Sequence, residues 1–186
     1  MGVSRELILG VAWLINAIGV KSESDLLDYS VLLKFWNIAL IMSCLRLPGF
    51  KDVKYQRLSP PVSRDVRKAS SEVLRDWKKI PEYAGEYEAL AGGELSKVKP
   101  MLGWGATRTE VAVIATYVVS KHPGMRPEDV IREVMLYVPY VFDTSIKFVL
   151  RYLARIGLAP REYARVGTRS KWARRKRARV VRSVDE

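Results

Sequence analysis

Ten lysine and arginine side chains lie between residues 161 and 182, in the stretch REYARVGTRSKWARRKRARVVR. Such cations bind phosphate oxygens, and a dense run of them indicates contact with a polyanion. The stretch also contains a Gly-Thr step at Gly167-Thr168 and one tryptophan, Trp172. Two interpretations are open: a cationic extension with nonspecific attraction to any polyanion, or a positioned binding element.

The positive charge of the chain is concentrated near its carboxyl end. The 186 residues include 32 Lys and Arg against 20 Asp and Glu, a formal net charge of +12. Between Asp143 and Glu186 there are 13 basic and four acidic residues, so +9 of the +12 belongs to the last quarter of the sequence. This distribution favours an anionic partner such as nucleic acid, an anionic membrane or a ribonucleoprotein particle.

The segment before the basic run, DTSIKFVLRYLARIGL, has the pattern of an amphipathic helix. We expect Asp143 to be its N-cap and Gly157 to end it. One stripe of this helix is apolar: Ile146, Val149, Leu150, Leu153 and Ile156. The opposite stripe is Thr144, Lys147, Phe148, Arg151 and Arg155. A helix that packs by one stripe and presents hydroxyls and long cations on the other suits the DNA major groove, whose width admits one helix.

Two further helices are predicted to position this one. TRTEVAVIATYVVSKHPG has Thr107 and Glu110 at capping-box spacing, followed by apolar residues at helical intervals. RPEDVIREVMLYV has Pro127 in the position that proline favours at the start of a helix. After the third helix, two short segments joined at Gly167-Thr168 favour a small β-hairpin.

Three helices followed by a two-stranded hairpin resemble the winged helix-turn-helix DNA-binding domain, over about residues 107 to 173. The resemblance implies that the third helix enters the major groove and that the wing reaches the DNA backbone or the minor groove. It assigns these residues to the groove: Thr144, Ser145, Lys147 and Arg151. It assigns these to the wing: Arg165, Arg169 and Lys171.

Five further cations are expected to contact nucleic acid: Arg155, Arg174, Arg175, Lys176 and Arg177. Residues 174–186 form a basic C-terminal tail, which we expect to order on DNA or RNA. Trp172 either stacks on a base or packs the wing against the core, and Phe148 either contacts a thymine methyl group or packs on another helix.

The first 92 residues are predicted to be a helical oligomerisation region, and residues 93–106 a linker. SRELILGVAWLINAIGV indicates a helix with Ser4 as its N-cap and Gly19 at its end. The next helix has almost no polar face between Tyr29 and Leu45, so it must be covered on all sides. Its apolar run of about 15 residues is short of the roughly 20 that a bilayer requires. We therefore expect no membrane partner, and a homodimer through the N-terminal helices.

A third N-terminal segment predicts a helix with one basic side. Its apolar side is Val66, Ala69, Val73, Trp77 and Ile80. Its cations are Arg64, Arg67, Lys68, Arg75, Lys78 and Lys79. This face either meets phosphate or is solvated, since acidic residues dilute it.

No set of residue types predicts catalysis. The chain has one histidine, His122, and one cysteine, Cys44, which are too few for a zinc-ligand cluster of these residue types, and we expect no Cys-His nucleophile pair. We expect no enzyme activity, no metal and no cofactor. A lone cysteine and the lack of a secretory signal pattern predict a cytoplasmic protein. Asparagine at only two positions and glutamine at one are typical of thermophile proteins.

The sequence thus predicts a mainly α protein, with an N-terminal helical region and a C-terminal winged helix-turn-helix that carries a small β-hairpin. The expected function is binding of duplex DNA as a transcriptional regulator. Two alternatives stay open. One is a structural or RNA-associated subunit of a ribonucleoprotein or replication assembly that recognises backbone shape without catalysis. The other is an adaptor that binds protein through its apolar N-terminal hairpin.

Overall fold

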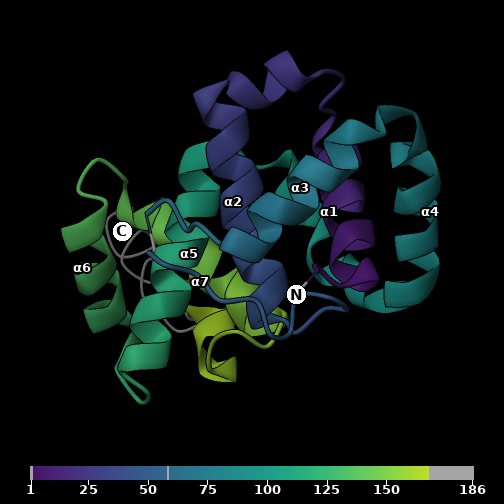
Figure 1. The fold of residues 1–186 in the computed structure, drawn as a ribbon. Coiled ribbons are helices and arrows are strands. Elements are labelled where there is room, and N and C mark those ends of the chain that lie inside the picture. The colour runs from purple at the N-terminus through teal and green to yellow at the C-terminus, as the bar shows by residue number, and fades with distance from the viewer. Residues whose placement is uncertain (1, 58, 168–186) are drawn as a thin grey trace, which may run out of the picture.

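The computed structural model describes residues 2–57 and 59–167 (Figure 1). This part of the chain contains seven α-helices: α1 (Arg5–Ile18), α2 (Tyr29–Cys44), α3 (Arg64–Arg75), α4 (Ile80–Ala91), α5 (Ala106–Lys121), α6 (Pro127–Tyr137) and α7 (Asp143–Arg155). It also contains five 3-10 helices: η1 (Glu23–Leu27), η2 (Trp77–Lys79), η3 (Gly92–Lys97), η4 (Lys99–Gly103) and η5 (Arg161–Arg165). These described residues include no β-strand, so the fold here is all-helical.

Helix α1 is the centre of the N-terminal half, in contact with α2, α3 and α4. The Ser4 hydroxyl accepts a 3.2 Å hydrogen bond from the backbone N–H of Leu7, and Gly19 ends the helix at φ 81°. Both termini therefore lie where the sequence predicts them, because a hydroxyl satisfies a free N–H at the start and glycine tolerates the left-handed conformation at the end.

Helix α2 is covered by its own chain. It packs mainly on α5 and also on α1, and its buried residues include Trp36, Asn37 and Ile38. The Asn37 side-chain amide donates a 3.2 Å hydrogen bond to the Thr109 hydroxyl, and both side chains are buried. The apolar length of α2 thus finds its cover within one chain, and a second copy is not needed to bury it. Among the described residues no helix has the length and apolar character that crossing a bilayer requires.

The basic amphipathic segment divides into two elements. Helix α3 buries Val66, Ala69 and Val73, as its period predicts, but ends before Asp76, whose φ of −126° and ψ of 63° leave the helical region. The single turn of η2 then leads into α4, in which Pro81 occupies the first turn. The expected continuous helix to residue 80 is therefore interrupted, and α4 runs at one edge of the molecule (Figure 1).

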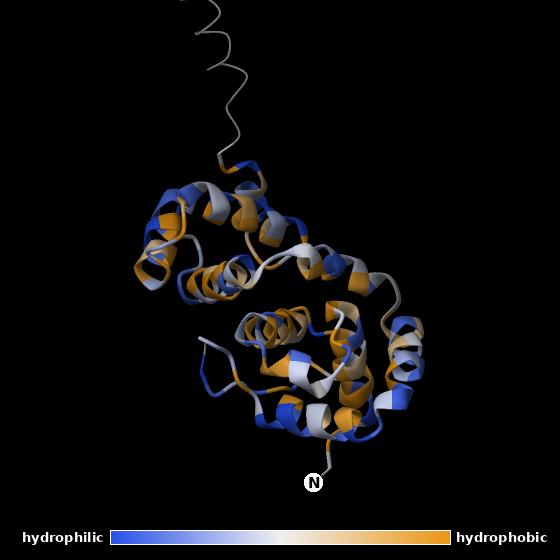
Figure 2. Ribbon diagram, turned by 90° about the horizontal axis from the view of Figure 1, so that it is seen from above, coloured by the Kyte–Doolittle hydropathy of each residue, from blue (hydrophilic) through white to orange (hydrophobic). Residues whose placement is uncertain are grey.

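The segment expected as a linker, residues 93–106, folds into η3 and η4. Four of its apolar side chains are buried: Leu95, Val98, Met101 and Trp104. They belong to one cluster of buried residues that extends from α1 to the end of η5. Apolar residues lie between the helices and polar ones toward the outside in Figure 2. The division of the chain into separate domains stays a prediction.

Helices α5, α6 and α7 form the expected three-helix unit, in which each helix contacts the other two. Helix α6 begins at Pro127, and α7 is followed by Gly157 at φ 86°. The buried stripe of α7 is the predicted one, with Ile146, Val149, Leu150 and Leu153. The N-cap of α5 is Gly105, two residues before the predicted Thr107. The N-cap of α7 is Phe142, one residue before the predicted Asp143.

The prediction of a strand as the first arm of the β-hairpin is wrong, because residues 161–165 form the 3-10 helix η5. Tyr163, in the middle of η5, is buried, and its hydroxyl donates to the carbonyl oxygen of Met125, a contact with a distant segment that local periodicity does not predict. The second arm of the hairpin lies outside the described residues.

Candidate nucleic-acid interface

Helix α7 presents the predicted polar stripe on the side opposite its buried residues. Thr144 and Arg155 are exposed, while Ser145, Lys147 and Arg151 are half-buried. The two long half-buried cations have partners within the chain. Their contacts determine what each can offer to a ligand.

Lys147 forms an ion pair one helical turn away. Its Nζ donates to the Asp143 carboxylate at 2.6 Å, an i,i+4 arrangement. This hydrogen bond is the main cause of the lowered pKa of Asp143. An exposed pair of this kind contributes little to stability, so Lys147 can exchange its partner for a phosphate at small cost.

Arg151 holds the end of the described chain against α7. Its guanidinium donates a 2.9 Å hydrogen bond to the carbonyl oxygen of Val166. Gly167 follows at φ 70°, and a Cβ built on it would lie 3.1 Å from the Cδ of Lys147. The chain therefore leaves the described fold on the cationic stripe of α7. The Gly-Thr step that the sequence marks as a turn does require glycine at this point.

Phe148 packs on another element, one of the two roles expected for it. Its ring meets Trp104 edge-on, with 5.6 Å between the centroids, and the Arg108 guanidinium lies 4.8 Å from the centre of the Phe148 ring. Trp104 also contacts Tyr152 at 4.8 Å. Phe148 still leaves 39% of its surface exposed. Arg108 was missed by the sequence analysis, because nothing local connects the start of α5 with α7.

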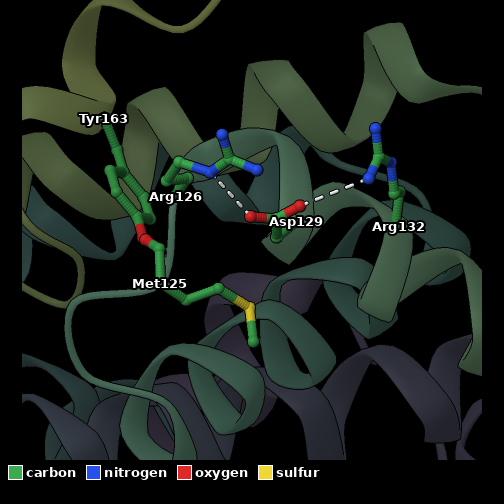
Figure 3. Close-up of polar contacts among 5 residues, drawn as sticks. All are labelled: Met125, Arg126, Asp129, Arg132 and Tyr163. Carbon is green, nitrogen blue, oxygen red and sulfur yellow. Dashed lines mark hydrogen bonds and ion pairs between the residues drawn. The ribbon is translucent and has the colours of Figure 1, made fainter.

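The 3-10 helix η5 adds exposed cations next to the end of α7. Arg155, Arg161 and Arg165 are all exposed, and η5 packs on α7. Tyr163 is buried and its hydroxyl donates to the carbonyl oxygen of Met125, which ties η5 to the turn between α5 and α6 (Figure 3). The cations of η5 are thus carried on a segment anchored from two sides.

Two more arginines lie on the first two turns of α6: Arg126 at its N-cap, next to Met125, and Arg132 in the second turn. Arg126 donates to Asp129 at 2.9 Å and Arg132 donates to it at 3.3 Å (Figure 3). The hydrogen bond from Arg126 is the main cause of the lowered pKa of Asp129. Glu128 lies in the same first turn of α6, so the two arginines are balanced by two carboxylates. The sequence analysis did not single out Arg126 or Arg132, because no local pattern marks them as ligand-binding residues.

The last turn of α6 and the turn that leads to α7 expose apolar side chains. Leu136 is 75% exposed and Phe142 is 79% exposed. Tyr140 donates a 2.5 Å hydrogen bond to Glu110, and burial is the main cause that raises the pKa of Tyr140 to about 12. These side chains lie just before the first turn of α7.

Seven of the predicted contact residues lie outside the described residues: Arg169, Lys171, Trp172, Arg174, Arg175, Lys176 and Arg177. The six others are brought together on α7 and η5: Thr144, Ser145, Lys147, Arg151, Arg155 and Arg165. His122 lies at the end of α5, as expected. Within residues 2–57 and 59–167, no group of three or more His, Cys, Asp or Glu side chains is placed to hold a metal ion.

Comparison with known proteins yields no relative. Neither a protein-family profile, nor a curated protein, nor a solved structure matches the chain. The function therefore has to be argued from the geometry and charge of the molecule.

Proposed function

We propose that this protein binds nucleic acid through α7, η5 and the basic segment that follows them, and that it acts on duplex DNA as a transcriptional regulator. The cations are the reason: a phosphate backbone binds proteins chiefly through Lys and Arg, with release of counterions. The proposal keeps the resemblance to a winged helix-turn-helix. In place of the first strand of the wing, η5 presents Arg161 and Arg165.

One observation carries the proposal. The chain passes over the cationic stripe of α7 at Val166 and Gly167, held there by Arg151. The ten basic residues between 161 and 182 therefore begin at the surface that α7 presents. Arg155, Arg161 and Arg165 extend that surface along the end of α7 and η5. A single polyanion can then meet both the described cations and the basic tail.

Base reading would fall to the first turn of α7. Residues near the N-terminus of a recognition helix contact base edges, and Thr144 is exposed there. Ser145 is its half-buried neighbour. Lys147 and Arg151 already have partners, so their part is to contact and align the backbone. This assigns sequence preference to Thr144 and Ser145, and affinity to the cations.

A second candidate is recognition of structured RNA by a subunit of a ribonucleoprotein or replication assembly. The engagement of Phe148 by Trp104, and of Arg151 by Val166, favours it. Both contacts reduce the part of α7 that is open to read bases. Backbone shape would then be the recognised feature.

We also propose a homodimer, but with Leu27 and Tyr29 rather than the buried side of α2 as the contact surface. Most apolar side chains in the second half of α2 are buried, those of its first turns are half-buried, and Leu27 and Tyr29 before and at its start are exposed. A dimer of duplex-binding units would place two half-sites about one helical turn apart. Sedimentation equilibrium of the free protein and of its complex measures the number of copies. A monomer in both would contradict the dimer and leave nucleic-acid binding unaffected.

A salt titration tests nucleic-acid binding. Fluorescence anisotropy would be measured with a labelled duplex, a single strand and a structured RNA. If five to eight cations meet phosphates, log affinity falls against log salt with a slope of about −4 to −7. Affinity unchanged between low and high salt would contradict the proposal. Tighter binding of RNA than of any duplex selected from a random pool would favour the second candidate over the first.

A further inference from the structure

A surface hollow of about 850 Å³ lies where four parts of the chain meet. They are the start of α1, the loop after α2, the first turns of α3 and Leu90 in the last turn of α4. Its volume is in the range of small-molecule sites, roughly 300–1,000 Å³. Neither α7 nor η5 contributes a residue to it. The hollow is therefore distinct from the proposed nucleic-acid surface.

Four basic side chains line this hollow. Arg46 and Lys51 come from the loop after α2, and Arg64 and Lys68 come from the first two turns of α3. None of the four forms an ion pair with a carboxylate of the described residues. Several cations in one hollow favour an anionic ligand, and planar arginines match the oxygens of a phosphate group.

Three carboxylates line the same hollow: Glu6, Asp52 and Asp65. The four basic and three acidic groups sum to a net charge of only +1, so net positive charge alone would not select a ligand for this hollow. Ionised carboxylates are acceptors only, and their natural partners in a ligand are hydroxyl groups. Phosphate-binding cations beside hydroxyl-binding carboxylates fit a phosphorylated sugar.

Arg46 has an unusual backbone for its residue type. It follows the end of α2 at φ 57°, the one non-glycine residue with positive φ in the described chain. Its N–H donates to the Ser43 carbonyl at 3.0 Å, and the next N–H, of Leu47, donates to Met42 at 3.1 Å. Glycine is the usual residue at this position of a helix end. An arginine here carries a cost in stability and adds a cation to the hollow.

We infer that this hollow binds the phosphate and hydroxyl groups of a phosphorylated sugar, such as the ribose phosphate of a free nucleotide. Cations from the loop and from α3 hold the phosphate. The carboxylates of Glu6 on α1, Asp52 in the loop and Asp65 on α3 accept hydrogen bonds from the sugar. The inference does not depend on the proposed function, because the two surfaces share no residue.

Isothermal titration calorimetry with ribose 5-phosphate and with inorganic phosphate tests the inference. We expect saturable binding of ribose 5-phosphate, at least about tenfold tighter than that of phosphate, because the sugar adds hydrogen bonds to carboxylates. Arg64→Ala and Lys68→Ala should each weaken it about tenfold. The matched control is Arg75→Ala, in the last turn of the same helix and outside the hollow, which should leave the affinity unchanged.

Arg46→Gly separates binding from folding. It should raise the melting temperature by about 2–4 °C, since glycine accepts positive φ without the penalty of a side chain, and should weaken ribose 5-phosphate about tenfold. A purely structural arginine would give no loss of binding.

Three results would overturn the inference. One is the lack of saturable binding of ribose 5-phosphate up to about 10 mM, a range in which even weak specific sites are detected. Another is an equal effect of Arg64→Ala and Arg75→Ala. The third is displacement of ribose 5-phosphate by a DNA duplex, which would assign the hollow to a nucleic-acid backbone.

Discussion

The guanidinium of Arg151 donates a 2.9 Å hydrogen bond to the carbonyl oxygen of Val166, 15 residues further along the chain. This contact connects the middle of α7 with the point where the basic segment begins. Because the contact fixes Val166 against α7, we expect Arg151 to have a positioning role in binding. A free arginine on the same helix would instead read the groove directly.

Arg151→Ala should therefore weaken binding to all duplexes alike. Loss of one hydrogen bond of about 1 kcal/mol corresponds to roughly fivefold in affinity. Thr144→Ala should instead change the preference among duplexes selected from a random pool, with little effect on a random duplex. Anisotropy titrations with both duplexes measure the two effects. A selective loss of sequence preference in Arg151→Ala would show that this residue reads bases.

Removing four cations of the tail, by substituting alanine at Arg174, Arg175, Lys176 and Arg177, should weaken every nucleic acid. The slope of log affinity against log salt should become less steep by about 3 to 4, because each phosphate contact contributes about 0.9 on duplex DNA. A control with alanine at Lys21, Lys54, Arg57 and Lys78 removes the same charge elsewhere. Equal slopes for the two variants would mean that the tail has no special part in binding.

Thr109→Val should destabilise the fold by about 1–3 kcal/mol. It removes the acceptor of the buried Asn37 amide, and a buried donor without a partner costs its full desolvation energy. Thr109→Ser keeps the hydroxyl and should cost less. Urea unfolding followed by circular dichroism compares the two. A loss in Thr109→Val no larger than that in Thr109→Ser would contradict a stabilising role of the hydrogen bond to Asn37.

Gly10 and Gly85 should respond to alanine with opposite signs. A Cβ at Gly10 would lie 2.5 Å from the Phe50 ring and 3.0 Å from the Tyr87 ring, so Gly10→Ala should cost about 1–3 kcal/mol through overpacking. A Cβ at Gly85 meets nothing within 4 Å, and Gly85→Ala within α4 should stabilise by about 0.5–1 kcal/mol. Thermal unfolding measures both. Stabilisation by Gly10→Ala would contradict the close packing of α1 on these rings.

The pKa of Asp129 should lie below its ordinary value of 3.8 and return toward it in Arg126→Ala. Arg132→Ala should move the pKa less, because the hydrogen bond from Arg126 is the largest cause of the shift. A lowered pKa contributes stability that is present above the unfolded value and is lost as the pH falls through the folded value. NMR titration of the side-chain carboxyl measures the pKa. A larger effect of Arg132→Ala would reverse the ranking of the two arginines.

The sequence determined most of the elements, because their signals are local. Ser4 and Gly19 bound α1, Pro127 begins α6 and Gly157 follows α7, since caps and breakers act within one turn of the helix that they limit. The buried stripe of α7 also follows from its own period. The positive charge at the carboxyl end is likewise a property of the sequence alone.

Only the tertiary structure decided which surfaces remain for a partner. The apolar surface of α2 predicted a second copy, but α5 covers it, and the contact of Asn37 with Thr109 joins residues 72 positions apart. The pattern around Tyr163 did not distinguish a strand from a 3-10 helix, because that choice depends on the contact with Met125, 38 positions away. The hollow lined by Arg46, Arg64 and Glu6 exists only once segments distant in the sequence pack together. Periodicity and capping act between near neighbours in the chain, whereas burial and the gathering of charge depend on contacts that no short stretch of sequence contains.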